Sequence, residues 1–201
     1  ELENISSNYV LGILNKEKFK EIQKEVDNTS NTIIFRDCPF FIDPRNDKLG
    51  VRVLSPLEKL YLTIKKLNLN IINEDDYFVK AYELGIPEKG LEFLKDKLFG
   101  LEANFESLKA IDFKKGCYIG QENTARMKLK NKLRRKLFAI KTDDKVKIGD
   151  DLTFNQKKIG KILISKPHPF ALVKLFDPDF LIFKDKKLKC GGTEVQIINQ
   201  S

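Results

Sequence analysis

The chain has 201 residues, enough for one large domain or two small ones with a buried core. Charged residues make up 33% of it, its mean hydropathy is -0.35, and no apolar run approaches the ~20 residues that a membrane-spanning helix needs. These values exclude a helical membrane protein, and we expect no membrane contact. The 37 basic and 29 acidic residues give a net charge of +8, which favours anionic partners, although an AT-rich coding sequence would produce the same lysine excess.

The cysteine spacing and the first residues of the chain are evidence on the cellular compartment of the protein. Cys38, Cys117 and Cys190 are widely spaced and form no C-x-x-C pair, which excludes a disulfide framework and a zinc-binding pattern. The first residues lack the basic start and apolar middle of a signal peptide, and the only methionine is Met127, so we expect a chain truncated at its front. A reducing compartment follows, and the prediction is a cytoplasmic protein.

The first third of the chain alternates strands and helices. We predict a strand at 9–14, a helix at 16–26, a strand at 32–35 and a strand at 49–54, with a proline-bracketed loop at 39–44. A further helix should begin after Ser55 as cap, with Pro56 at its first position and Glu58 completing a capping box. With a closing strand at 70–72, this order matches a ferredoxin-like unit.

The middle of the chain has one clear helix and a long irregular segment. The pattern predicts a helix over 74–84 that ends at Gly85. Residues 86–113 read as mostly irregular, with a short helix near 91–98. Such long segments are often functional rather than merely connecting.

The last third of the chain has the pattern of a small β-barrel or sandwich. Short apolar runs separated by turns rich in Gly, Asp, Asn and Pro predict strands at 137–141, 152–154, 159–165, 171–176 and 195–198. We therefore predict an α+β protein with two domains. Residues 1–130 form the first, N-terminally incomplete domain, and residues 131–201 form a C-terminal β-barrel.

The stretch around Cys117 is the candidate for reactive chemistry. It reads Lys114-Lys115-Gly116-Cys117-Tyr118-Ile119-Gly120-Gln121-Glu122, with a helix predicted from about Gln121. A thiol beside cations and a helix N-terminus is stabilised as thiolate, the form that attacks electrophiles or binds metal. An ordinary buried cysteine is the alternative. With no cysteine nearby and His168 as the only histidine, Cys117 is predicted to be a lone activated thiol or a transient metal ligand.

A basic segment follows the cysteine stretch. Six of the ten residues from Met127 to Lys136 are basic, which is usually a solvated face but could also bind phosphates or carboxylates. A weak RNA contact from Lys128 to Lys136 is therefore one hypothesis. Just before it, Glu122 and Arg126 are spaced to pair across one helical turn.

Several of these stretches resemble one protein family. K-G-C-Y-x-G-Q-E at 115–122, Thr124-Ala125-Arg126 and residues 133–138 resemble the YgfZ-type folate-binding proteins and their mitochondrial relatives in iron–sulfur assembly. Residues 82–87 look like the E-A-G-F-P-type segment of that family, and parts of the last third resemble the terminal barrel of glycine-cleavage aminomethyltransferases.

The resemblance implies a ferredoxin-like folate-binding part with tetrahydrofolate as cofactor. In the family the glutamate of the E-A-G-F-P-type segment faces the pterin, which makes Glu83 the ligand here, with Tyr82, Tyr118, Gln121 and Arg126 as further folate-binding residues. Cys117 is the implied reactive residue.

The function implied by the resemblance is an accessory factor that assembles or repairs iron–sulfur clusters, with client or assembly proteins as partners and a link to tRNA modification. A folate-dependent aminomethyl transferase is the alternative. The aminomethyltransferases lack the cysteine motif, and their catalytic aspartate lies in the missing front part, so the assembly branch is favoured.

Overall fold

A computed structural model describes residues 2–116, 119–129 and 133–198. The chain divides into two compact units, Glu1–Asn73 and Glu74–Ser201, and each has a hydrophobic core of its own. The predicted boundary at residue 131, which separates a folate-binding part from a barrel, stays a prediction. None of the helices in the described ranges is long and apolar enough to cross a membrane.

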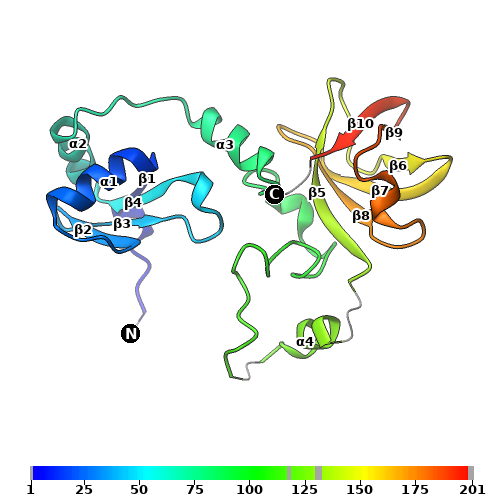
Figure 1. The fold of residues 1–201 in the computed structure, drawn as a ribbon, viewed down its shortest axis with the longest axis horizontal. Helices are drawn as coiled ribbons and strands as arrows, with labels where there is room; N and C mark the ends of the chain where they lie inside the picture. Colours follow the sequence, from blue (N-terminus) through cyan, green and yellow to red (C-terminus); the bar gives the residue numbers. More distant parts are fainter. Residues whose placement is uncertain (1, 117–118, 130–132, 199–201) are drawn as a thin grey trace. The chain divides into compact units, whose positions relative to one another are not determined.

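The first unit is a four-stranded sheet with two helices (Figure 1). Its sheet has the order β1-β4-β3-β2, and every neighbouring pair is antiparallel. The 3-10 turn η1 (Ser6–Asn8) precedes the sheet, and a second 3-10 turn, η2 (Asp47–Leu49), lies between its third and fourth strands. The elements in chain order are β1 (Val10–Leu14), α1 (Lys16–Glu25), β2 (Thr32–Phe35), β3 (Cys38–Ile42), β4 (Val51–Ser55) and α2 (Leu57–Lys66).

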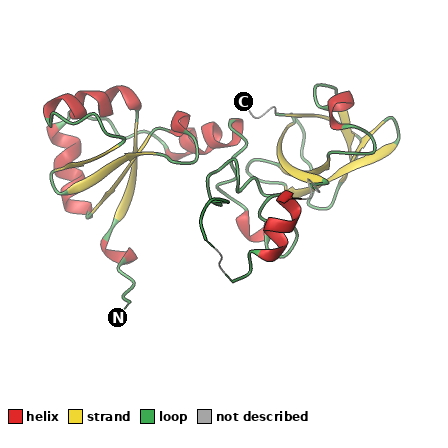
Figure 2. Cartoon of the chain, turned by 60° about the horizontal axis from the view of Figure 1, so that its bottom comes forward, coloured by secondary structure: helices red, strands yellow, loops and turns green. Residues whose placement is uncertain are grey.

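Both helices cover the same face of this sheet (Figure 2). Phe19 and Ile22 of α1 are buried against the inward side chains of the strands, which alternate with outward ones as expected for a sheet buried on one side. Leu60 of α2 and Leu67 just after it complete the cluster. The cluster's buried strand residues are Ile33, Phe35, Cys38, Phe40, Val51 and Val53.

The first unit departs from the prediction at β3. The segment expected to be a proline-bracketed loop contains a central strand, Cys38–Ile42, paired with both β2 and β4. Pro39 is tolerated because it lies beside a tight hairpin turn, whose two central residues, Arg36 and Asp37, both have positive φ. Residues 70–72 form no strand, so the closing strand of a ferredoxin-like unit is absent from the described sheet and that part of the fold prediction is unconfirmed.

The start of α2 also differs from the prediction. The helix begins after Pro56, and Ser55 makes no side-chain cap to it. Ser55 is instead the last residue of β4, fully buried, with its hydroxyl donating to the Pro56 carbonyl and lying 3.1 Å from the Cys38 sulfur. The Ser55 side chain therefore lies on the inward face of the strand, and its hydroxyl does not cap α2.

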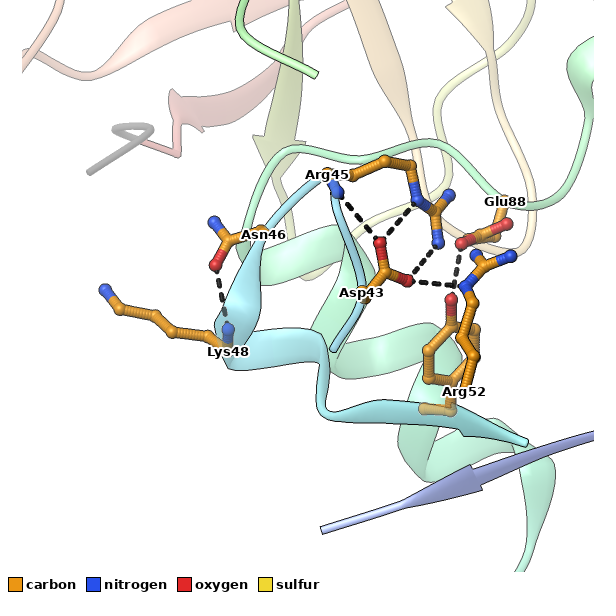
Figure 3. A network of polar contacts seen from close by, with 7 residues as sticks. Asp43, Arg45, Asn46, Lys48, Arg52 and Glu88 are labelled. Carbon is orange, nitrogen blue, oxygen red and sulfur yellow. Dashed lines mark hydrogen bonds and ion pairs between the residues drawn. The ribbon is translucent and has the colours of Figure 1, made fainter. Parts of the chain in front are cut away.

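A buried carboxylate joins the β3–β4 loop to the sheet (Figure 3). Asp43 is 2% exposed and accepts hydrogen bonds from Arg45 Nε and Nη2 at 3.1 and 2.9 Å and from Arg52 Nε at 2.8 Å. Burial opposes ionisation, but the hydrogen bonds from the two guanidinium groups outweigh it and lower the pKa of the Asp43 carboxyl. The β3–β4 loop is thus held in place by a buried carboxylate that is paired with two guanidinium groups.

The second unit is built on a closed six-stranded barrel with the order β10-β5-β8-β7-β6-β9 (Figure 1). Before the barrel come α3 (Glu74–Glu83), the 3-10 turn η3 (Leu91–Leu94) and α4 (Glu122–Leu129). The short helix α5 (Phe180–Phe183) lies between β8 and β9. The strands are β5 (Arg135–Lys141), β6 (Asp151–Phe154), β7 (Lys157–Ile164), β8 (Phe170–Lys174), β9 (Leu188–Cys190) and β10 (Thr193–Ile197).

The barrel confirms the predicted strands of the last third and adds two elements. Its interior is filled by aliphatic and aromatic side chains, among them Ile140, Leu152, Ile162 and Phe183, all fully buried. The sequence pattern missed the three-residue strand β9 and the helix α5, because each is too short to show a period. Closure of the barrel leaves no unpaired edge among these strands.

Candidate functional site

The C-terminal end of α3 holds the two residues predicted to contact folate. Gly85, with φ +72°, ends the helix as predicted: its N–H donates to the Tyr82 carbonyl at 2.8 Å, and the Ile86 N–H donates to the Ala81 carbonyl at 2.8 Å. Ala81 and Ile86 are buried, so this end of the helix is fixed. The last turn then carries Tyr82 inward and leaves Glu83 exposed.

Tyr82 is at the centre of an aromatic cluster with the barrel. Its ring stacks on His168 with centroids 4.8 Å apart and meets Phe170 edge to face at 5.8 Å. Its hydroxyl donates a hydrogen bond to the backbone carbonyl of Ile140 in β5. The cluster therefore holds α3 against the barrel through both packing and a hydrogen bond.

Burial sets the protonation states in this cluster. It raises the pKa of the Tyr82 hydroxyl to about 12, so this group remains a hydrogen-bond donor at neutral pH. It also lowers the pKa of His168, an effect that Asp75 opposes and Lys89 reinforces, so the imidazole is neutral at pH 7. A neutral His168 is consistent with stacking on an apolar ring.

The cavity beside Tyr82 is very small. Its volume of about 10 Å³ is room for a single water molecule at most. Polar groups surround it: Tyr77 donates to Glu88 at 2.6 Å, and the Lys89 ammonium lies 3.9 Å from the centroid of the Phe78 ring. A flat pterin ring does not fit into this cavity, and the exposed Glu83 is not among the residues that line it.

The irregular segment 86–113 is tied to the barrel by two buried polar residues. Glu102 accepts hydrogen bonds from Arg135 Nε at 2.9 Å and from the Phe99 N–H at 3.0 Å, and its carbonyl accepts from the Leu137 N–H at 2.8 Å. Asn104 donates to the Leu137 carbonyl at 2.9 Å. As predicted, this segment has little regular structure, but these bonds hold it in one place.

The cysteine stretch lies at the end of this anchored segment. Cys117 and Tyr118 fall outside the described residues. On the two sides of them, Lys114, Lys115, Gly116, Ile119 and Gly120 are all exposed, and Gly120 has φ +87°, the left-handed conformation that favours glycine. The described residues on both sides of Cys117 and Tyr118 are therefore exposed, and residues 119–120 form a turn.

The helix α4 begins after Gln121, as predicted. The Ala125 N–H donates to the Gln121 carbonyl at 2.8 Å, Gln121 is half-buried, and Arg126 is exposed. The pair predicted between Glu122 and Arg126 is not formed in the described structure.

Lys128 fixes α4 to the segment before the motif. It forms an ion pair with Glu106, and its ammonium lies 5.5 Å from the centroid of the Phe113 ring. Residues before the motif, Glu106 and Phe113, therefore contact Lys128, which follows the motif.

Several cations of the basic segment are paired or partly buried, so the segment can bind an anionic partner less readily than its sequence indicates. Lys128 is paired with Glu106, Arg135 is paired with buried Glu102, and Lys136 is half-buried, which lowers the pKa of its ammonium. Lys130 and Lys132 lie outside the described residues. An RNA contact from Lys128 to Lys136 stays a prediction.

A larger, open cleft is found at one end of the barrel. Its volume is about 560 Å³, within the range of small-molecule sites. The loop that contributes His168 to the aromatic cluster contributes Pro167 and Pro169 to this cleft. The cleft is lined by Thr142, Asp144, Lys145, Val146, Ser165, Lys166, Pro167 and Pro169.

The predicted site residues thus fall into two groups. Tyr82 and Glu83 end α3, whereas Gln121 directly precedes α4 and Arg126 lies within it, and no hydrogen bond or ion pair joins the two groups among the residues that the structure describes. In the same described ranges, no group of three His, Cys, Asp or Glu side chains is placed to hold a metal ion. Sequence reasoning missed the stacking of Tyr82 on His168, because the two residues are 86 positions apart.

Comparison with known proteins places these features in a class: the fold of the chain is that of glycine-cleavage aminomethyltransferases. A crystal structure of glycine cleavage system aminomethyltransferase T from Bartonella henselae matches 89% of this chain and 55% of its own with a TM-score of 0.55, at 13% identity. At this identity the likeness concerns the fold alone. No model of a protein family matches the chain.

The sequence relatives are more specific, and they confirm the resemblance to the iron–sulfur assembly proteins. The chain is 33% identical over 105 residues to the mitochondrial iron-sulfur cluster assembly factor IBA57 homolog of Dictyostelium discoideum, and 33% identical over 101 residues to mitochondrial IBA57 of Mus musculus. These matches cover 51% and 50% of this chain but only 26% and 27% of the relatives. The chain thus aligns with about a quarter of each relative's length.

The same relatives correct the predicted location. They are named as mitochondrial proteins, so the prediction of a cytoplasmic protein is wrong. That prediction used the lack of disulfide-type cysteine spacing, which indicates a reducing compartment but does not distinguish one such compartment from another.

Proposed function

We propose that the protein takes part in the assembly or repair of iron–sulfur clusters in mitochondria. One observation carries this proposal: about half of the chain is homologous to mitochondrial iron–sulfur cluster assembly factors. The aminomethyltransferase-like fold is a second, coarser support. The partners would be cluster-containing client enzymes or other assembly proteins.

In this proposal Cys117 supplies the reactive group. Lys114 and Lys115 precede it, and α4 begins five residues after it, so positive charge and a helix N-terminus both favour the thiolate. One thiolate is a single ligand, whereas a cluster usually requires four. The cluster is thus a substrate that Cys117 holds briefly while a partner provides the remaining ligands.

The exposed flanks of the motif support such a transfer. A partner can approach Gly116 and Gly120 closely, because neither glycine has a neighbouring atom within 4 Å of the position that a Cβ would take. The Lys128–Glu106 pair keeps the ends of the turn together. The described flanks of the motif are thus exposed and accessible to a partner protein.

Tetrahydrofolate is the proposed cofactor, with Glu83 as its pterin ligand and Tyr82, Tyr118, Gln121 and Arg126 as further contacts. The fit is incomplete: the cavity beside Tyr82 is too small for a pterin, and the 560 Å³ cleft is lined by none of these residues. No step of the proposed function is therefore assigned to folate. Calorimetric titration of tetrahydrofolate into the wild type and Glu83→Ala tests this contact, and equal binding by both would contradict it.

The role of Cys117 is tested by complementation in cells that lack the protein. Cys117→Ser should fail to restore the activity of cluster-dependent enzymes. Cys190→Ala is the matched control, since Cys190 is buried in the barrel and burial raises the pKa of its thiol to about 11, which keeps it unreactive. Full restoration by Cys117→Ser, with equal protein levels, would refute the proposal for this residue.

A second function, folate-dependent aminomethyl transfer, is favoured by the fold likeness alone. It requires a base close to the folate. Production of methylene-tetrahydrofolate from an aminomethyl donor would decide for it, and a Cys117→Ser variant with undiminished turnover would separate it from the assembly function.

A further inference from the structure

The helix α5 displays an apolar turn at one end of the barrel. Phe180 stacks on Phe138 with centroids 4.8 Å apart, and Phe183 is fully buried in the barrel core. These two residues, three positions apart, bind the inward side of the turn to the barrel. Leu181 and Ile182 lie between them and point outward, with 67% and 56% of their surfaces exposed.

A third apolar residue extends this surface. Phe176, in the loop that leads into α5, is 61% exposed. Asp179 caps the helix by accepting the Leu181 N–H at 3.0 Å, and the Phe180 N–H donates to the Leu175 carbonyl at 3.2 Å. The loop is thus held in shape, and its exposed apolar side chains are displayed by an ordered turn. We call Phe176, Leu181 and Ile182 the α5 patch.

The α5 patch lies among cations. Residues 174–189 contain five lysines against three aspartates. Lys174, Lys186 and Lys189 are exposed, whereas Lys187 is paired with Glu194 and Lys184 lies 4.0 Å from Asp185. Of the three aspartates, Asp179 is used as the helix cap.

The start of β5 brings Arg134, an exposed cation, to the same end of the barrel, whereas Arg135 is paired with Glu102 and Lys136 is half-buried. Arg135 and Lys136 pair in register with Lys174 and Val173 of β8, and the Leu175 N–H donates to the Arg134 carbonyl at 2.8 Å. Exposed apolar side chains within a basic surround are the two features that draw a protein to an anionic bilayer surface.

We propose that the α5 patch inserts shallowly into the surface of an anionic membrane, while the surrounding lysines contact lipid phosphates. The shape of the patch favours a membrane over a protein partner. It is a single turn with its preceding loop and has three exposed apolar side chains, whereas a stable protein interface uses about 20–30 residues on each side. A stable protein interface buries about 800 Å² on each partner. This peripheral contact differs from a membrane span, and it replaces the predicted absence of membrane contact.

Co-sedimentation of the full chain with lipid vesicles tests the proposal. Vesicles of phosphatidylcholine with 30% phosphatidylglycerol should retain the wild type, and vesicles of phosphatidylcholine alone should retain at least tenfold less. The double variant Leu181→Glu, Ile182→Glu should lose most binding to the anionic vesicles. Because both side chains are exposed, its circular dichroism and melting temperature should match those of the wild type.

The opposite end of the barrel provides matched controls. Ile148 is 40% exposed and lies between β5 and β6, at the end of β5 away from α5, so Ile148→Glu should bind the anionic vesicles like the wild type. Exchanging Lys186 and Lys189 for glutamine should weaken binding several-fold, and exchanging Lys145 and Lys147 should not. Raised salt should weaken binding of the wild type.

Two results would overturn the proposal. One is equal binding of the wild type and the Leu181→Glu, Ile182→Glu variant to anionic vesicles. The other is absence of binding to anionic vesicles by the wild type; if the wild type then self-associates and the same variant abolishes this, the α5 patch is a protein contact.

Discussion

The two units of this protein bury their apolar residues in different ways. The four-stranded sheet is open: it has two edges and depends on α1 and α2 to cover one face. The barrel is closed, and its strands and α5 enclose the core without such a layer. An open sheet is therefore stabilised by alternation of side chains along each strand, whereas a closed barrel is stabilised by filling its interior.

The uncovered face of the open sheet leaves apolar side chains exposed. Leu11, Ile13, Ile34 and Leu54 point away from the helices and are 40–62% exposed. By register, Leu11 lies opposite Leu54 and Ile13 lies opposite Arg52. In the barrel, closure places the inward side chains of all six strands against one another. The following substitutions test this contrast.

The largest effect is expected in the barrel. Phe183→Ala removes a fully buried ring that contacts Phe154 and Phe180, so the free energy of unfolding of the second unit should fall by about 3–5 kcal/mol. Denaturant titration followed by circular dichroism measures this. Leu181→Ala, two residues away and exposed, should change it by less than about 0.5 kcal/mol. Similar losses from both would mean that α5 does not close the barrel core.

In the sheet, two adjacent isoleucines form a matched pair. Ile33 is 2% exposed and packs against the helices, whereas Ile34 is 62% exposed on the uncovered face. Ile33→Ala should cost about 3 kcal/mol of unfolding free energy in the first unit, and Ile34→Ala about 0.5 kcal/mol. A large loss for Ile34→Ala would show that another surface covers the outer face in solution.

The buried Asp43 makes the open sheet sensitive to pH. Asp43→Asn should lower the unfolding free energy of the first unit by about 1–3 kcal/mol, because Arg45 and Arg52 lose a charged acceptor. Since the pKa of Asp43 lies below its ordinary value of 3.8, its contribution is complete above that value and is lost as the pH falls through the lower pKa. The wild type and variant should therefore converge in strongly acidic solution. A constant difference at all pH values would contradict this account.

The smallest effect is expected at the aromatic cluster. Tyr82→Phe keeps the ring but removes the hydrogen bond to the Ile140 carbonyl, at a cost of about 1 kcal/mol. His168 is the only histidine, so nuclear magnetic resonance titration reports its pKa directly. The pKa should stay below 6.5 in Tyr82→Phe and rise toward 6.5 in Tyr82→Ala, where the ring no longer shields the imidazole. No rise in Tyr82→Ala would show that other residues bury the imidazole.

The elements that were predicted well are those whose signal is local. The Gly85 stop of α3, the start of α4 after Gln121 and most barrel strands each depend on a few neighbouring residues. The central strand β3 was missed because Pro39 is a strong local signal against a strand, and a tight hairpin turn overrides it.

The candidate site could be predicted only in part. Family resemblance pointed to Glu83 and Cys117, and their roles in the site stay predictions. It could not indicate that the cavity beside Tyr82 is nearly filled by His168 and Phe170, because side chains far apart in the chain produce that packing.

Sequence alone determined the presence of the cysteine motif, the basic character of the chain and the alternation that makes its strands. The tertiary structure decided which side chains are buried, which are paired and which are exposed. It placed Ser55 inside the sheet instead of at a helix cap, paired Arg135 with a buried glutamate, and left Leu181 and Ile182 exposed beside buried phenylalanines. The physical reason is that local patterns depend on backbone geometry over a few residues, whereas burial and charge pairing depend on contacts between distant segments, which exist only once the chain has folded.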